Sequence, residues 1–165
     1  MYFKNIYGQS LKPCRNKKSL DLSGSWNSHG YCDEEDGGVH KICVDVNNTN
    51  QFSKNTGQGD WSDTRKNKNH CMCLGAWALY KAKQDKNIIP YSTNELKCES
   101  IMEDVFHPKY IQKWNSWNGI ELPNQIENGV QHLYNQCYQK GSPSQKKYLS
   151  NLYQNLQNHY KFRKL

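Results

Sequence analysis

The spacing of apolar residues predicts its clearest structure in the last third of the chain. Pro123 suits the first turn of a helix, and Gly141 suits the position just after a helix end. Between them, apolar residues recur at helical spacing: Ile126, Val130, Leu133 and Cys137. We therefore expect an amphipathic helix that packs one face against a core.

A second helix is predicted directly after Gly141. The stretch Ser142-Pro143-Ser144-Gln145 has the order of a capping box, with proline at the first helical position. Because the turn between the two helices is short, they are expected to form an antiparallel hairpin. The apolar stripe of the second helix consists of Leu149, Leu152, Leu156 and Tyr160.

Earlier in the chain the periodicity changes. Residues 39–46 alternate as a strand does, with His40, Ile42, Val44 and Val46 on one face and Lys41, Cys43 and Asp45 on the other. The elements expected after this strand are a polar loop over 47–69, a helix over 75–84 and short helices near 99–106 and 108–114.

These elements predict an α+β fold in two parts. Residues 1–95 are expected to form an irregular, cysteine-bearing domain that contains β-structure. Residues 96–165 are expected to form a helical segment that ends in the hairpin. Residues 1–38 lack a regular element in this prediction because glycine and proline interrupt them and few apolar positions are periodic.

The net charge of +7 is unevenly distributed along the 165 residues. No acidic residue follows Glu127, so six of the basic residues lie in the last 38 positions and the rest of the chain is nearly neutral. This asymmetry suggests an anionic partner, which could be a nucleic acid, a membrane surface or an acidic protein. The excess of Lys over Arg and the many Asn residues are typical of an AT-rich genome, such as that of a bacterium, a protist or a large DNA virus.

On an ideal helix, four lysines of this basic end share one face beside the apolar stripe. They form the predicted anion-binding set: Lys146, Lys147, Lys161 and Lys164. Phosphate binding requires clustered positive charge of this kind. The alternative is an ordinary amphipathic helix whose water-facing side is rich in lysine.

The sequence predicts neither a membrane-spanning helix nor a secretory signal. Its longest nearly apolar stretch, residues 71–80, is much shorter than the roughly 20 residues of a membrane helix. The first residues do not have the pattern of a secretory signal. We therefore expect an intracellular protein in a reducing compartment, the cytoplasm, or the virion or host cytoplasm for a viral protein, with its thiols reduced.

Cysteine and histidine gather in the first 73 residues. Reduced cysteines beside histidines suggest a zinc site or thiol chemistry, although the ligands are not spaced as in a standard zinc motif. Burial of cysteine as a small apolar residue is the alternative. The candidate metal ligands are Cys14, Cys32, His40, Cys43, His70, Cys71 and Cys73.

Thiol catalysis is a second interpretation of the same residues, with Cys71 or Cys73 as the nucleophile and a histidine as its base. His40 could approach either thiol from a neighbouring strand. Cys137 lies on the apolar stripe of a helix and is expected to pack in the core. The acidic run over residues 33–36 is expected to be a solvated turn, and Asp60 or Trp61 is the better candidate for a pocket residue.

Three separated blocks of the chain occur in the same order in a known family. They are Gly30-Tyr31-Cys32, the stretch over residues 36–43 that ends in His40-Lys41-Ile42-Cys43, and the stretch over 70–77 that begins His70-Cys71-Met72-Cys73. Over about residues 5–95 the chain thus resembles the uncharacterised family catalogued as domain of unknown function number 2237. The residues that the resemblance selects are Cys14, Cys32, His40, Cys43, Cys71, Cys73 and Trp77.

That family has no established activity, so the resemblance implies a shared Cys/His set and no reaction. The loop with Trp61 and the helical C-terminal extension depart from the family pattern. Three hypotheses follow for this chain: a protein with a structural metal or thiol centre, a structural or interaction protein of a virion or nucleoprotein that uses the basic helix, and a thiol enzyme.

Overall fold

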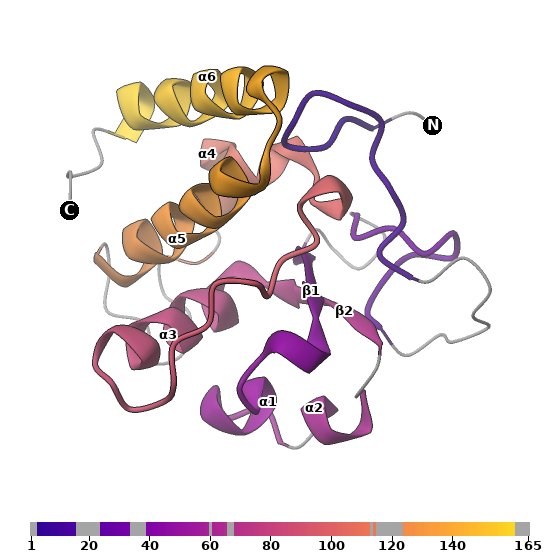
Figure 1. Cartoon of the computed structure of the whole chain (residues 1–165), viewed down its shortest axis with the longest axis vertical. Helices are drawn as coiled ribbons and strands as arrows, with labels where there is room; N and C mark the ends of the chain where they lie inside the picture. The colour runs from indigo at the N-terminus through magenta and orange to yellow at the C-terminus, as the bar shows by residue number, and fades with distance from the viewer. Residues whose placement is uncertain are drawn as a thin grey trace.

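The structure is a computed structural model that describes residues 3–15, 24–33, 39–59, 61–65, 68–112, 114 and 124–160. It has an α+β fold, as predicted, in which a small antiparallel sheet packs beside helices (Figure 1). Several predicted features lie outside the described residues: acidic residues 34–36, Asp60, Pro123, Lys161 and Lys164.

The sheet consists of two strands, β1 (His40–Asp45) and β2 (Asn69–Cys73). The strand predicted from alternation is therefore confirmed. Cys43 is the register partner of Cys71, and His40 is the partner of Cys73 across an irregularity in the pairing. Ile42, Cys43 and Val44 are all fully buried, so both faces of this short sheet are covered by protein.

The connection between the strands is more ordered than the predicted polar loop. It contains the 3₁₀ turn η2 (Val46–Asn48) and the single-turn helices α1 (Phe52–Asn55) and α2 (Trp61–Thr64). Phe52 is fully buried, with its ring 4.9 Å from that of Tyr80 and 5.6 Å from that of Trp61. Burial of this aromatic side chain attaches an otherwise polar segment to the core.

The remaining regular elements of the described chain are helices. The predicted helix over 75–84 is α3 (Leu74–Asp85), and the predicted short helices are η3 (Cys98–Ser100), η4 (Glu103–Phe106) and α4 (Pro108–Gln112). The predicted hairpin is α5 (Asn124–Lys140) followed by α6 (Pro143–Tyr160). Its capping box is confirmed, because Ser142 N donates to Gln145 Oε1 (2.9 Å) and Gln145 N donates to Ser142 Oγ (3.3 Å).

One hydrophobic core runs through the molecule from Ile6 to Leu156. It therefore includes residues on both sides of the predicted boundary at residue 95, and Tyr7 donates a hydrogen bond to the carbonyl of Cys137 across it. The division into two domains stays a prediction.

Helices α3 and α5 pack closely at Gly129. The indole nitrogen of Trp77 donates to the Gly129 carbonyl at 2.8 Å, and Ala78 lies against the same glycine. A Cβ atom on Gly129 would stand 2.7 Å from Ala78 Cβ and 2.8 Å from Ala78 Cα. Real Cβ atoms do not approach so closely, so this glycine sets the distance between the two helices.

Gly129→Ala is accordingly expected to destabilise the protein by about 1–3 kcal/mol, although alanine normally stabilises a helix interior by about 1 kcal/mol relative to glycine. Urea unfolding followed by circular dichroism measures the change. Ala78→Gly in the same chain should recover part of the loss, because it removes one of the two clashing atoms. A Gly129→Ala protein at least as stable as the parent would contradict the close packing.

Candidate functional site

Six of the seven cysteines are paired in this structure, whereas reduced thiols were expected from the sequence. Disulfides join Cys14 to Cys43, Cys32 to Cys71, and Cys98 to Cys137. The Cα atoms of each pair are 5.6–5.7 Å apart, within the normal range of a disulfide. Cys137 packs in the core, as predicted, but bonded to Cys98 of η3. The spacing of cysteines along the chain could not reveal this connectivity.

Two of these disulfides attach the N-terminal segment to the sheet. Cys43 on β1 and Cys71 on β2 face each other in register, and their partners Cys14 and Cys32 both belong to residues before β1. Hydrogen bonds run beside the disulfides, from Cys14 N to the Gly30 carbonyl (2.8 Å) and from Cys71 N to the Gly24 carbonyl (2.8 Å). The described parts of this segment, 3–15 and 24–33, contain no regular helix, so these attachments hold its position.

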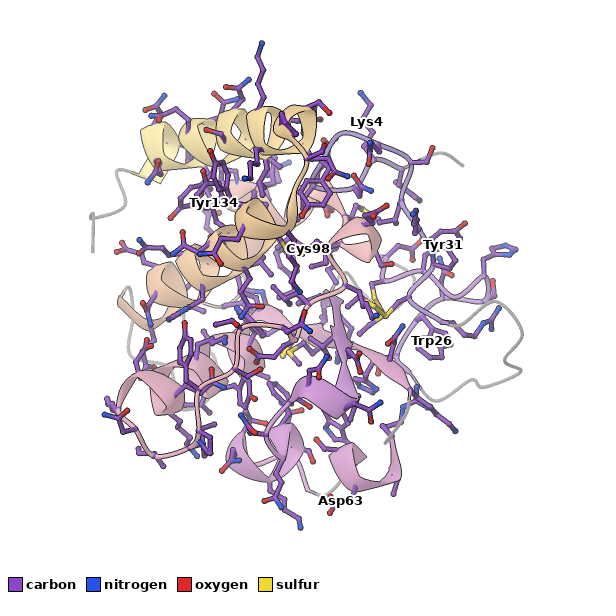
Figure 2. All side chains as sticks on the ribbon, viewed as in Figure 1. Lys4, Trp26, Tyr31, Asp63, Cys98 and Tyr134 are labelled. Carbon is purple, nitrogen blue, oxygen red and sulfur yellow. A yellow bond between two sulfur atoms is a disulfide. The ribbon has the colours of Figure 1, made fainter. Side chains whose placement is uncertain are left out.

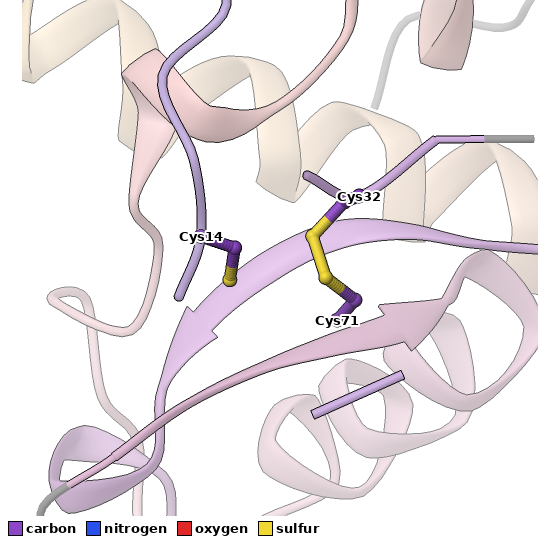
Figure 3. A group of neighbouring side chains, drawn as sticks. All are labelled: Cys14, Cys32 and Cys71. Atoms are coloured by element: carbon purple, nitrogen blue, oxygen red, sulfur yellow. A yellow bond between two sulfur atoms is a disulfide. The ribbon is translucent and has the colours of Figure 1, made fainter. Parts of the chain in front are cut away.

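The same arrangement brings sulfur atoms from both disulfides together. The Sγ atoms of Cys14, Cys32 and Cys71 all lie within 4.8 Å of one another, and all three residues are buried. Figure 3 shows the Cys14 sulfur beside the bond that joins Cys32 to Cys71. With Cys43 bonded to Cys14, four of the seven predicted ligands form one compact cysteine centre.

The other three predicted ligands lie elsewhere among the described residues. His70 points away from Cys71, its neighbour on the strand, and stacks on Trp61 with ring centroids 4.1 Å apart. His40 is opposite Cys73 in the sheet, as the thiol hypothesis anticipated. Cys73 is free and buried, and its Sγ accepts a hydrogen bond from Ala76 N (3.4 Å) at the start of α3.

These positions weigh against a catalytic thiol. Cys71 is held in a disulfide, and burial raises the pKa of the Cys73 thiol above its ordinary value. A reactive cysteine requires the opposite, a lowered pKa and access to solvent. The sulfur of Cys73 acts instead as the cap of α3.

The predicted basic face is only partly described. Lys147 on α6 is exposed, whereas Lys146 is half-buried with its ammonium 5.4 Å from the centroid of the Tyr138 ring. Among the described residues, no helix is long and apolar enough to cross a membrane. The binding of an anion to the α6 lysines stays a prediction.

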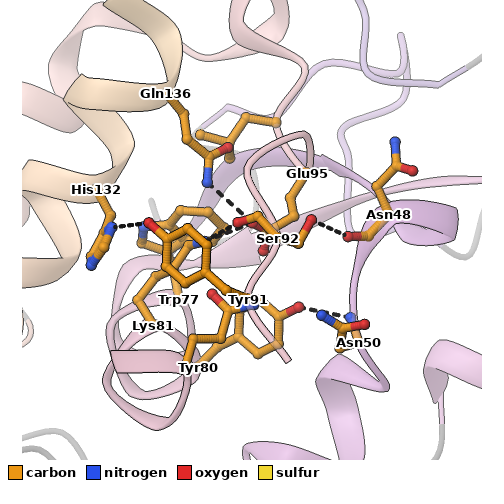
Figure 4. A network of polar contacts seen from close by, with 12 residues as sticks. Asn48, Asn50, Trp77, Tyr80, Lys81, Tyr91, Ser92, Glu95, His132 and Gln136 are labelled. Atoms are coloured by element: carbon orange, nitrogen blue, oxygen red, sulfur yellow. Dashed lines mark hydrogen bonds and ion pairs between the residues drawn. The ribbon is translucent and has the colours of Figure 1, made fainter. Parts of the chain in front are cut away.

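A second buried centre, which sequence reasoning missed, lies where α3 meets α5. Lys81 Nζ and Glu95 Oε1 are 2.6 Å apart, and both side chains are fully buried. Lys81 also donates to the Ser92 carbonyl (2.9 Å), and Gln136 Nε2 donates to Glu95 Oε1 (3.1 Å), as Figure 4 shows. Helices α3 and α5 are thus joined through the segment that carries Glu95.

Aromatic rings surround the buried ammonium. Lys81 Nζ lies 4.9 Å from the ring centroids of Trp77 and Tyr91, and 5.8 Å from that of Tyr80 (Figure 4). The negative faces of these rings supply part of the solvation that water would give an exposed lysine. Burial nevertheless lowers the pKa of Lys81 and raises the pKa of Glu95. The charge of each partner opposes the pKa shift of the other.

An outer layer of polar contacts continues from this ion pair. The Tyr91 hydroxyl lies 3.3 Å from His132 Nδ1, and His132 Nε2 lies 3.0 Å from Asp85 Oδ2. Backbone N of Asn50 donates to the Tyr80 hydroxyl at 2.7 Å. The network therefore connects α3, α5 and the loop before α1, which makes it a structural junction.

One feature of the sequence could have identified Lys81. It falls on the apolar stripe of α3, at helical spacing from Leu74, Trp77 and Ala78, where a lysine must be buried or paired. Glu95 carries no comparable signal, because it follows an irregular stretch. Its partnership with Lys81 is visible only in three dimensions.

Comparison of the chain with family models, with curated proteins and with solved structures finds no match. The resemblance to the family of domain of unknown function number 2237 therefore stays a prediction.

Proposed function

We propose that the cysteine centre is a structural centre with two chemical forms, a pair of disulfides in oxidising surroundings and a zinc–thiolate site in a reducing compartment. The approach of the Cys14, Cys32 and Cys71 sulfurs to within 4.8 Å of one another carries this proposal. Its ligands would be these three residues and Cys43. In either form the centre would hold the N-terminal segment against the sheet.

The chemistry of conversion balances with a dithiol reductant. Each disulfide takes two electrons and two protons from the reductant, which becomes a disulfide itself, and yields two thiols. When four thiols bind Zn²⁺ as thiolates, they release four protons. Zinc binding thus becomes stronger as the pH rises through the ordinary range of thiol pKa values.

The geometry supports a tetrahedral site after small movements. Zinc–sulfur bonds of about 2.3 Å place the sulfurs of a tetrahedral site roughly 3.8 Å apart. The Cys14 sulfur needs to approach the Cys32 and Cys71 sulfurs by at most about 1 Å, whereas the two sulfurs of each disulfide, Cys14–Cys43 and Cys32–Cys71, must separate. Both cysteines that face each other in the sheet, Cys43 and Cys71, sit on backbone already fixed by strand pairing.

This proposal fits an intracellular protein, of a virus or of a cell, in which the reduced form would prevail. In this proposal the centre does not catalyse a reaction, because all four cysteines are buried. The zinc form would maintain the same attachments that the disulfides make. The role of these thiols would then be structural and not catalytic.

Zinc analysis of the full chain tests the proposal. We expect the protein, reduced and refolded with zinc, to retain a single ion per chain after desalting, and Cys14→Ser to lose it. The oxidised protein should retain none and should show one alkylatable thiol, Cys73, after denaturation. Less than about half an equivalent of zinc on the folded, reduced parent would overturn the proposal.

Two matched variants serve as controls. Cys73→Ser removes the free cysteine two positions from Cys71, and the Cys98→Ser/Cys137→Ser protein removes a distant pair. Both should bind zinc as the parent does. Equal loss of zinc from Cys14→Ser and from these controls would show that the metal is bound nonspecifically.

A further inference from the structure

A cavity of about 280 Å³ lies where residues 96–100 meet the N-terminal segment and the end of α5. Its charged lining residues are Lys12, Lys97, Glu99 and Lys140. Cys98 lies in the same wall, between α5 and the N-terminal segment (Figure 2), and its disulfide to Cys137 fixes η3 against α5. The wall is therefore a preformed one.

Positive charge exceeds negative charge around this cavity. Three lysines and one glutamate line it, which leaves a net charge of +2. Lys12 pairs with Glu99 at 2.6 Å, whereas Lys97 approaches Asp45 only to 3.9 Å. Both of these lysines are about half-exposed or more, so their ammonium groups can turn toward a ligand.

Lys140, at the end of α5, is the third cation of the lining. Its Nζ donates to the neutral carbonyl of Leu96 at 3.1 Å. Burial, together with the charge of Lys97, lowers its pKa. An anion placed between Lys97 and Lys140 would relieve the repulsion between the two ammonium groups. The adjacent apolar residues Leu96 and Cys98 would lower the local dielectric constant and thereby strengthen the attraction between the anion and the lysines.

We propose that this cavity binds the phosphate group of a small phosphorylated molecule, held by Lys12, Lys97 and Lys140. A phosphate group carries about two negative charges at neutral pH, which matches the net charge of the lining. Lysine binds phosphate as a compact point charge with three donors. The volume is near the lower end for ligand cavities, about 300 Å³, so it fits one or two phosphate groups and excludes a nucleic-acid duplex.

Calorimetric titration of the full chain with inorganic pyrophosphate at low salt tests this site. We expect saturable binding that Lys97→Gln weakens by about tenfold or more, since a charge-assisted contact is lost. Lys140→Gln should weaken it similarly. Because Lys97 is half-exposed, its variant is expected to fold, and its urea unfolding curve verifies this.

The Lys146→Gln/Lys147→Gln protein is the matched control, because it removes two charges from α6 and none from the cavity. Its affinity for pyrophosphate should change by less than about twofold. Absence of saturable binding to the parent, or equal weakening in the control, would overturn the proposal. Binding of a single-stranded oligonucleotide without any binding of pyrophosphate would also overturn it.

Discussion

Glu95→Ala is expected to lower the free energy of unfolding by about 3–5 kcal/mol, because it leaves the Lys81 ammonium buried without its carboxylate. Both side chains are fully buried, so water cannot replace the lost partner. The three rings around Lys81 compensate only in part, since a cation–π contact contributes about 0.5–2 kcal/mol. Urea unfolding followed by tryptophan fluorescence measures the loss, with Trp77 beside the ion pair as a local reporter.

Two control proteins separate the burial of a charge from loss of the pair itself. Lys81→Met/Glu95→Leu removes both charges and should be more stable than Glu95→Ala, because no unpaired charge remains in the core. Lys54→Ala breaks the exposed ion pair with Asp63 and should cost less than about 1 kcal/mol. If Glu95→Ala costs no more than Lys54→Ala, the buried pair does not contribute as the structure implies.

The second large effect is expected from the disulfides. Replacing Cys32 and Cys71 by serine under oxidising conditions should lower the free energy of unfolding by about 4 kcal/mol, because a loop of 39 residues is no longer closed in the unfolded chain. Replacing Cys98 and Cys137 removes a loop with the same sequence separation of 39. The two double variants should therefore lose similar amounts of stability in urea unfolding.

They should differ in where the native protein opens. Loss of the Cys32–Cys71 bond releases residues 24–33, which are held by turns and by few backbone hydrogen bonds to the sheet. Hydrogen exchange in this segment should become faster in that variant alone. In the Cys98→Ser/Cys137→Ser protein the Cys32–Cys71 bond is intact, so residues 24–33 should exchange as in the parent. Equally fast exchange of residues 24–33 in both variants would contradict the role of Cys32.

The C-terminal hairpin was predictable because its determinants are local. The capping box at Ser142 and Gln145 acts within one helical turn, and the apolar stripes follow a period that holds wherever the helix packs. The strand over β1 was predicted from alternation for the same reason. The burial of the second face of this strand was not predicted. Lys41 on that face is fully buried and paired with Asp104, because the short sheet is covered on both sides.

The candidate site was predictable only as a set of residues. Cysteine clusters before residue 74, and the structure brings Cys14, Cys32 and Cys71 together, with Cys43 bonded to Cys14. Their role as metal ligands stays a prediction. The other predicted ligands, His40, His70 and Cys73, are not among the residues of that sulfur cluster. Side chains on successive strand residues point to opposite faces, and this separates His70 from Cys71.

By itself, the sequence determined the helices and strands of this protein, because helical period, strand alternation and caps depend on residues close together in the chain. The uneven distribution of charge is also visible in the sequence alone. The tertiary structure alone decided which cysteines pair, that Lys81 meets Glu95, and that three lysines from distant segments line one cavity. The reason is physical. Hydrogen bonds of helices and turns join residues a few positions apart, whereas sulfur pairs, buried charges and cavities depend on how segments far apart in the chain are brought together.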